Sequence, residues 1–189
     1  MSYDYLFKVV FVGGPCVGKT ALTERLISNK FPYNYDATIG VDFSAKSLII
    51  DNMNIKTHIW DTAGQKCFSS IITTYFTGVA GAAIMFDIGR KSSFCQVDYW
   101  REEIEKRRTM NHVPVMILIA NKVDKKHREV SKEEAEKYAE KFQELGGDMF
   151  LENKVYGIRD TSNTLEITTD KQTLSARQIV NCAGLQSDL

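Results

Sequence analysis

Three short stretches of the chain are almost continuously apolar, at residues 6–12, 81–87 and 113–120. An apolar run of this length without alternation is typical of a strand buried on both faces of a parallel sheet. Two further segments, 43–51 and 55–60, flank the turn-forming sequence DNMN, and this pattern predicts a β-hairpin. The chain is therefore expected to contain a mostly parallel sheet with one antiparallel hairpin.

Apolar residues recur at helical spacing between these strands. One helix is expected over residues 19–29, and a later one between a capping box, Ser131-x-x-Glu134, and a stop at Gly146-Gly147. Because strands and helices alternate, we predict an α/β fold, a six-stranded mostly parallel sheet with helices on both faces. The apolar stripes of two helices are Phe94, Val97, Trp100 and Ile104, and Ala135, Tyr138, Ala139, Phe142 and Leu145.

The bulk composition is that of a globular domain. The chain has 189 residues, of which 43% are hydrophobic and 25% charged. The 24 Lys and Arg balance 24 Asp and Glu, so composition gives no case for nucleic-acid binding. No apolar run is long enough to span a membrane, and the N-terminus lacks the basic region and the cleavage site of a signal peptide. Four scattered cysteines fit reduced thiols, so we expect a cytoplasmic protein.

The sequence GGPCVGKT, residues 13–20, follows the first apolar run and opens the first helix. This Gly-x-x-x-x-Gly-Lys-Thr pattern predicts a loop whose backbone N–H groups surround a chain of phosphates. The dipole of the following helix adds positive potential. Lys19 is expected to reach the outer phosphates and the Thr20 hydroxyl to bind Mg²⁺. The residues expected to bind nucleotide here are Gly13, Cys16, Val17, Gly18, Lys19 and Thr20.

The sequence NKVD, residues 121–124, follows the last apolar run. The Asp124 carboxylate is suited to accept hydrogen bonds from N1–H and the exocyclic amine of guanine, a pair that adenine does not offer. Asn121 is expected to tie this loop to the phosphate loop, and the stem of Lys122 to lie along the base. We therefore predict a guanine nucleotide rather than an adenine nucleotide.

A third motif, WDTAGQ at residues 60–65, lies between the other two. We expect Asp61 to hold a water of the Mg²⁺ shell and Gly64 to let the backbone approach the γ-phosphate. Gln65 is the candidate catalytic residue, because a glutamine orients the attacking water in this class of reaction. Upstream, Thr38 supplies a second hydroxyl for Mg²⁺, so the predicted metal residues are Thr20, Thr38 and Asp61.

Together these motifs resemble the small GTPases of the Ras superfamily, and IGVDF at 39–43 resembles the Rab branch. The resemblance implies a P-loop G domain that binds GTP or GDP with Mg²⁺ and hydrolyses GTP as a switch in vesicle trafficking. It also implies that Phe31 and Tyr35 lie at the nucleotide. Partners implied are effectors, exchange factors and activating proteins, with a monomer as the basic unit. The implied effector surface is Ile39, Phe43, Trp60 and Tyr75, although aromatics on half-buried strands also serve as core.

The resemblance covers residues 5–152, which we take as the G domain. Pro15 replaces a small flexible residue, and Lys66-Cys67 replaces the usual Glu-Arg. Residues 153–189 diverge: the loop that meets guanine O6 is not recognisable, Ser175-Ala176-Arg177 comes too late, and too few residues follow for the final helix. We expect a poorly ordered tail, and membrane association only through partners because no prenylation signal is visible.

Two alternatives remain open on the sequence. A pseudo-GTPase or truncated module would use the aromatic residues to hold partners without cycling nucleotide. A P-loop ATPase or nucleoside kinase is disfavoured by NKVD and by the lack of an arginine-rich lid.

Overall fold

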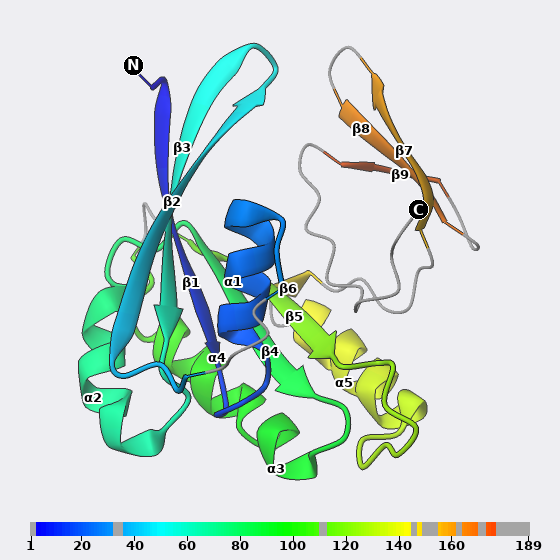
Figure 1. Cartoon of the computed structure of the whole chain (residues 1–189). Helices are drawn as coiled ribbons and strands as arrows, with labels where there is room; N and C mark the ends of the chain where they lie inside the picture. The colour runs from blue at the N-terminus through cyan, green and yellow to red at the C-terminus, as the bar shows by residue number, and fades with distance from the viewer. Residues whose placement is uncertain are drawn as a thin grey trace.

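A computed structural model describes residues 3–31, 36–109, 113–144, 147–148, 155–161, 164–169 and 173–176. Side chains are described as far as residue 142, except that of Lys66. Strands and helices alternate along the chain as the apolar pattern predicts (Figure 1). The strands and α-helices are β1 (Tyr5–Gly13), α1 (Lys19–Ser28), β2 (Val41–Ile50), β3 (Met53–Thr62), α2 (Ser69–Ile72), β4 (Gly81–Asp87), α3 (Lys91–Phe94), α4 (Val97–Glu105), β5 (Val115–Asn121), α5 (Lys132–Glu144), β6 (Gly147–Asp148), β7 (Val155–Thr161), β8 (Thr164–Thr169) and β9 (Thr173–Ala176).

The main sheet has six strands in the order β2-β3-β1-β4-β5-β6. β2 and β3 are antiparallel, and every other neighbouring pair is parallel. This confirms the predicted α/β class with a six-stranded, mostly parallel sheet. The strand order reverses at β1, so the loop after β1 lies at the topological switch point, where open α/β sheets bind ligands.

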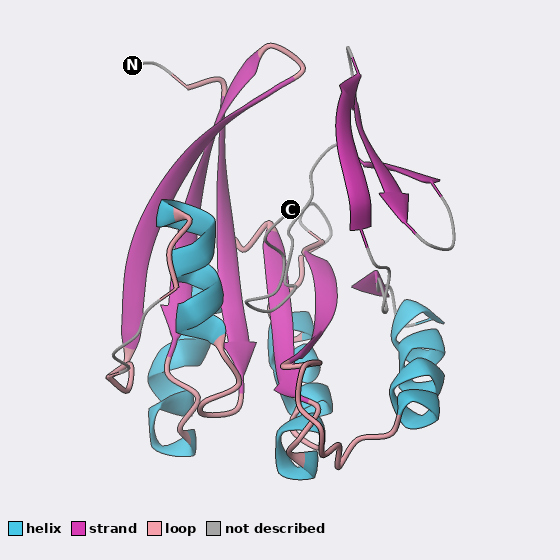
Figure 2. Ribbon diagram, turned by 45° about the vertical axis from the view of Figure 1, so that its right-hand side comes forward, coloured by secondary structure: helices cyan, strands magenta, loops and turns pink. Residues whose placement is uncertain are grey.

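Alternate residues of β1 point to opposite faces of the sheet. Val10 and Val12 belong to a core with α2, α4 and α5, whereas Phe11 packs with α1 residues in a second core. Trp100 of α4 and Phe142 of α5 are among the largest fully buried side chains. Burying Trp100 and Phe142 stabilises the fold by roughly 1.5–3 kcal/mol each. Helices on both faces thus fix the strands whose carboxyl ends carry the predicted motifs, and Figure 2 shows this layering.

The β2–β3 hairpin forms where DNMN predicts it, although both strands are longer than expected. Asp51 and Asn52 have φ angles of 51° and 61°, the left-handed conformation needed at both central positions of a type I′ turn. Asp and Asn adopt that conformation more readily than most residues.

The start and end of α5 differ from the sequence prediction. Ser131 Oγ accepts a hydrogen bond from the Glu134 N–H at 3.1 Å, which is half of the predicted capping box. The Glu134 carboxylate instead pairs with Lys91 of α3, because the fold brings that ammonium group within reach. Gly147 was expected as part of a helix stop. In the structure Gly147 and Asp148 also form the short sixth strand, which pairs with β5.

Beyond residue 152, the described backbone forms a three-stranded antiparallel sheet in the order β7-β8-β9. No helix occurs among the residues described there. Ser175 and Ala176 lie in β9, paired with Glu166 and Leu165 of β8. The rest of the tail lies outside the described residues, so the expectation of a poorly ordered tail stays a prediction. Among the helices that the structure describes, none is long and apolar enough to cross a membrane.

Candidate nucleotide-binding site

The predicted motifs meet at the carboxyl edge of the sheet. β1 ends in the phosphate loop, β3 ends just after Asp61, and β5 ends at Asn121. A cleft at this edge is lined by the phosphate loop together with residues from the segments around Thr38 and Gln65. Its lining is Pro15, Cys16, Gly18, Lys19, Thr20, Ala37, Thr38, Thr62, Gly64 and Gln65.

Two glycines of the phosphate loop are required by close approach. A Cβ on Gly13, whose φ is 143°, would lie 2.2 Å from the Met85 carbonyl oxygen. A Cβ on Gly18, whose φ is 104°, would lie 2.3 Å from Asn121 Nδ2. Larger residues would therefore clash and strain the backbone, so these glycines let the loop pack against β4 and against the NKVD segment.

Lys19 lies beneath the loop and is only 5% exposed. Its Nζ donates hydrogen bonds to the Gly13 and Gly14 carbonyls at 3.0 and 2.8 Å. Burial lowers the pKa of Lys19 to about 8, although Asp61 and Cys16 oppose the shift and Arg90 adds to it. A buried ammonium whose hydrogen bonds within the described part of the chain go to two neutral carbonyls is suited to gain an anionic partner such as a phosphate.

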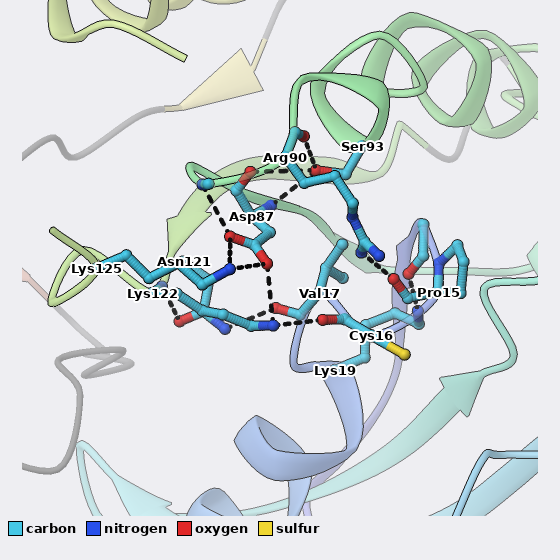
Figure 3. Close-up of polar contacts among 12 residues, drawn as sticks. Pro15, Cys16, Val17, Lys19, Asp87, Arg90, Ser93, Asn121, Lys122 and Lys125 are labelled. Carbon is cyan, nitrogen blue, oxygen red and sulfur yellow. Dashed lines mark hydrogen bonds and ion pairs between the residues drawn. The ribbon is translucent and has the colours of Figure 1, made fainter. Parts of the chain in front are cut away.

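The NKVD segment is linked to the phosphate loop by two side chains (Figure 3). Asn121 Nδ2 donates to the Val17 carbonyl at 2.7 Å, which is the link expected from the sequence. Lys122 Nζ donates to the Cys16 carbonyl at 2.6 Å, and Asn121 Oδ1 accepts the Lys122 N–H at 2.9 Å. Asp124 is exposed on the turn that follows, where its carboxylate is accessible to a base.

Three oxygen-bearing side chains meet beside Lys19, where the sequence places Mg²⁺. The Thr20 hydroxyl donates to Asp61 Oδ2 at 2.6 Å, and the Thr38 hydroxyl lies 2.9 Å from that of Thr20. Asp61 is 1% exposed, and its Oδ1 has no hydrogen-bond partner among the described residues. Burial raises the pKa of Asp61, although hydrogen bonds from Thr20 and Thr38 and the charge of Lys19 oppose it.

A buried carboxylate oxygen without a partner, beside two hydroxyls, fits Mg²⁺ well. This ion binds oxygen ligands, takes only one or two carboxylates and keeps several waters. Thr20, Thr38 and Asp61 are therefore the residues that would hold it.

Two further predicted residues lie on the opposite wall of the cleft. A Cβ on Gly64 would fall 2.3 Å from the Gly14 carbonyl carbon, so a larger residue would push this segment away from the phosphate loop. Gln65 is exposed, and its Oε1 lies 3.7 Å from Cys67 Sγ. Phe31, after α1, is 42% exposed. Tyr35 lies outside the described residues.

The predicted effector aromatics form one group of contacting rings, edge-on and tilted, across β2, β3 and the segment after α2. The Phe43 and Tyr75 rings each lie 5.0 Å from that of Trp60, centroid to centroid. Phe43 is 47% exposed, whereas Trp60 packs against the core. Ile39, the fourth predicted residue of this surface, is 83% exposed. The group is therefore partly core and partly surface.

Three charged residues at the edge of this site, Asp87, Arg90 and Lys125, were not predicted as site residues from the sequence. The Asp87 carboxylate, at the end of β4, accepts hydrogen bonds from Lys125 Nζ at 3.0 and 2.9 Å and pairs with Lys122 Nζ at 3.0 Å. Burial opposes ionisation of Asp87, but the hydrogen bonds from Lys125, Lys122 and the Gly89 N–H prevail and lower its pKa. Arg90 donates to the Pro15 carbonyl. For Asp87, its place at the carboxyl end of a parallel strand was the available signal, whereas Arg90 had none.

Comparison with known proteins places this geometry in a family. The model of the Ras family matches residues 8–154. The GTP-binding protein ypt3 of Schizosaccharomyces pombe is 43% identical over 139 residues. This match covers 73% of the chain but 64% of the relative, so the chain spans less than two thirds of that protein.

Proposed function

Because the chain belongs to the Ras family, as the Rab-type motifs of its sequence indicate, we propose that it is a GTP-binding switch that hydrolyses GTP to GDP and phosphate. The observation that carries this proposal is the convergence of three separate motifs at one edge of the sheet: the phosphate loop, the Thr20–Thr38–Asp61 group and the Asn121 link. The relative ypt3 is itself named a GTP-binding protein. We further propose that the switch has a Rab-like role in vesicle trafficking.

Nucleotide binding rests on the phosphate loop and NKVD. Inward-facing N–H groups of residues 16–20 surround the phosphates, and Lys19 contributes a charge-assisted hydrogen bond. Asp124 selects guanine by accepting from N1–H and the exocyclic amine. Asn121 and Lys122 hold the two loops at a fixed separation, so the base and phosphate sites act as one unit.

Hydrolysis is assigned to the opposite wall of the cleft. Gln65 orients the water that attacks the γ-phosphate, and the Gly64 backbone lets the γ-phosphate lie close to the loop. When bound at Thr20, Thr38 and Asp61, Mg²⁺ neutralises charge on the phosphate oxygens. Loss of the γ-phosphate removes the group that Thr38 and Gly64 contact, so both segments are released from the cleft.

Partner proteins distinguish the GTP-bound from the GDP-bound state by this release. Ile39, Phe43, Trp60 and Tyr75 lie next to the two segments and present an apolar surface to effectors, while exchange factors and activating proteins act on the segments themselves. As part of the same proposal, the protein acts in the cytoplasm and meets membranes through such partners.

The direct test is to identify the nucleotide that copurifies with the protein. The protein is denatured and the released nucleotide separated by chromatography. We expect GDP or GTP at about one per chain, and GTP loaded in Mg²⁺ should convert to GDP in a single-turnover assay. Retention of adenine nucleotide would overturn the base assignment. Retention of GTP without conversion would favour the pseudo-GTPase, and a Gln65→Leu sample gives the reference for a slowed reaction.

A further inference from the structure

We propose that Arg90 is a positioning residue of the phosphate site, which holds the Pro15 carbonyl outward and thereby aims the Cys16 N–H at the nucleotide. The inference rests on the proposed function and adds a residue that belongs to none of the three motifs. Figure 3 shows the Arg90 side chain extending from the turn between β4 and α3 to Pro15.

The argument begins with the geometry of a peptide unit. In a trans peptide the C=O and the next residue's N–H point in opposite directions, and the described residues contain no cis peptide. Arg90 Nη2 donates to the Pro15 carbonyl from outside the loop. The Cys16 N–H, which belongs to the same peptide unit, must therefore point away from Arg90 and toward the interior of the loop.

The next two peptide units are held in the same way. Lys122 Nζ holds the Cys16 carbonyl at 2.6 Å, and Asn121 Nδ2 holds the Val17 carbonyl at 2.7 Å. Three consecutive carbonyls thus accept hydrogen bonds from side chains of other segments, and by the same trans-peptide geometry the N–H groups of residues 16 to 18 each point away from those donors. Arg90 completes this series from the turn between β4 and α3, whereas the other two donors come from the NKVD segment.

Arg90 holds the Pro15–Cys16 peptide, where the loop backbone is in a strained conformation. Cys16 has φ 55°, a left-handed conformation that is costly for a residue with a Cβ. Pro15 has no N–H, so the loop cannot donate from that residue. A cation on the Pro15 carbonyl both holds the strained peptide and polarises the Cys16 N–H, which strengthens it as a donor to an anion.

Arg90 is itself anchored well enough for this role. Its backbone N–H donates to the Asp87 carbonyl at 3.0 Å. Its carbonyl accepts from Ser93 Oγ at 2.7 Å and from the Ser93 N–H at 3.0 Å. The side chain is half-buried, which limits its freedom before the nucleotide arrives.

The test compares Arg90→Ala and Arg90→Lys with a matched control, Arg25→Ala. Arg25 is exposed on α1 and also donates to a backbone carbonyl, that of Asn29, at 3.2 Å. Affinities for GDP, GTP and GMP are measured by competition against a fluorescent guanine nucleotide, together with the melting temperature. GMP serves as the reference ligand, because a general loss of folding would lower the affinity for GMP as well.

We expect Arg90→Ala to weaken GDP and GTP by about tenfold, or about 1.4 kcal/mol, and to speed GDP release by a similar factor. GMP affinity should change less than twofold, Arg90→Lys should recover most of the loss, and Arg25→Ala should behave as wild type. Equal losses for GMP and GDP, or no loss at all, would overturn the assignment.

Two outcomes separate this proposal from the one it rests on. A wild-type protein that binds no guanine nucleotide would overturn the proposed function itself. Should Arg90→Ala fail to fold, Arg90→Gln keeps a neutral donor, and the same selective loss for GDP over GMP, smaller in size, is then expected. An Arg90→Gln protein with unchanged GDP release would overturn the positioning role.

Discussion

The phosphate loop and the segments that face it across the cleft are built in opposite ways. In the loop, Val17 is fully buried, Lys19 is 5% exposed, and three consecutive carbonyls are held by side chains of other elements. On the other side Ile39 and Ile71 are 83% and 51% exposed, and the helical pieces between residues 66 and 76 are one turn long and enter the core chiefly through Ile72 and Phe76. Segments with few buried contacts open at low free-energy cost.

This difference separates two tasks. A loop fixed before the nucleotide arrives loses little entropy on binding, so affinity resides there. The opposite segments can change conformation at small cost, so they can report which nucleotide is bound. The two regions touch at few points, chiefly where Gly64 packs on Gly14 and where Thr20, Thr38 and Asp61 meet.

The largest effect is expected from removing the central charge of the fixed loop. Lys19→Ala should weaken GDP and GTP by about a hundredfold, or roughly 2.7 kcal/mol, because it removes a charge-assisted hydrogen bond to phosphate. Titration against a fluorescent nucleotide measures this, with Lys141→Ala on α5 as a charge-matched control. If Lys19→Ala bound GDP as tightly as Lys141→Ala, the fixed loop would not be the source of affinity.

Base selection at NKVD should show the next largest effect. Asp124→Asn replaces an acceptor with a group that also donates, so GTP should lose about thirtyfold in affinity, or about 2 kcal/mol. Xanthosine triphosphate, which has a carbonyl in place of the amine, should gain relative to GTP. Competition titrations measure the ratio, and Asp51→Asn in the distant hairpin serves as control. A ratio equal to that of wild type would remove Asp124 from the base site.

The third prediction tests the exposed side of the cleft alone. Gln65→Leu should leave GTP affinity within about twofold but slow single-turnover hydrolysis at least tenfold, about 1.4 kcal/mol of barrier. This outcome would assign binding and reaction to separate walls of the cleft. A parallel loss of affinity would show that the Gln65 wall also contributes to binding, and an unchanged rate would favour the pseudo-GTPase.

The smallest effect concerns the support behind the fixed loop. Asp87→Asn should lower the free energy of unfolding by about 1 kcal/mol at pH 7, because it weakens hydrogen bonds to Lys122 and Lys125. The folded state lowers the pKa of Asp87. Its contribution is therefore present above the unfolded pKa, which is near 4, and is lost as pH falls through the lower folded pKa.

Urea unfolding at pH 7 and at pH 3 checks both parts of this expectation. The difference between wild type and Asp87→Asn should shrink at the lower pH. Glu134→Gln is the control, because its ion pair with Lys91 is on the surface and should contribute little. An equally large change in the control would mean that the Asp87 cluster is an ordinary surface feature.

The sequence predicted the elements whose signals are local. Apolar runs located the buried strands, and the glycine pattern placed the phosphate loop after β1, because only glycine fits at positions 13 and 18. The Asn121 link was also anticipated, since motif spacing places both loops at one sheet edge.

Side-chain partners that depend on tertiary proximity were not predicted. Glu134 was expected to complete its own capping box, yet it pairs with Lys91, which is 43 positions away. Arg90 reaches Pro15 across 75 positions, and nothing in the local pattern distinguishes it from a solvent-exposed arginine. The tail was the other limit: polar and apolar residues alternate over 164–168 and 173–176, which was the available signal for β8 and β9, but the sequence prediction did not use it.

Gly89 links the tolerance of one position to the conformation of another side chain. A Cβ at residue 89 would lie 2.7 Å from Lys125 Cδ and 3.3 Å from Asp87 Oδ1. The flexible Lys125 side chain could shift away, but its Nζ would then leave the Asp87 carboxylate that it contacts at 3.0 and 2.9 Å. The two positions are thus epistatic: a larger residue 89 is expected to cost less in a Lys125→Ala background, where that ion pair is already absent.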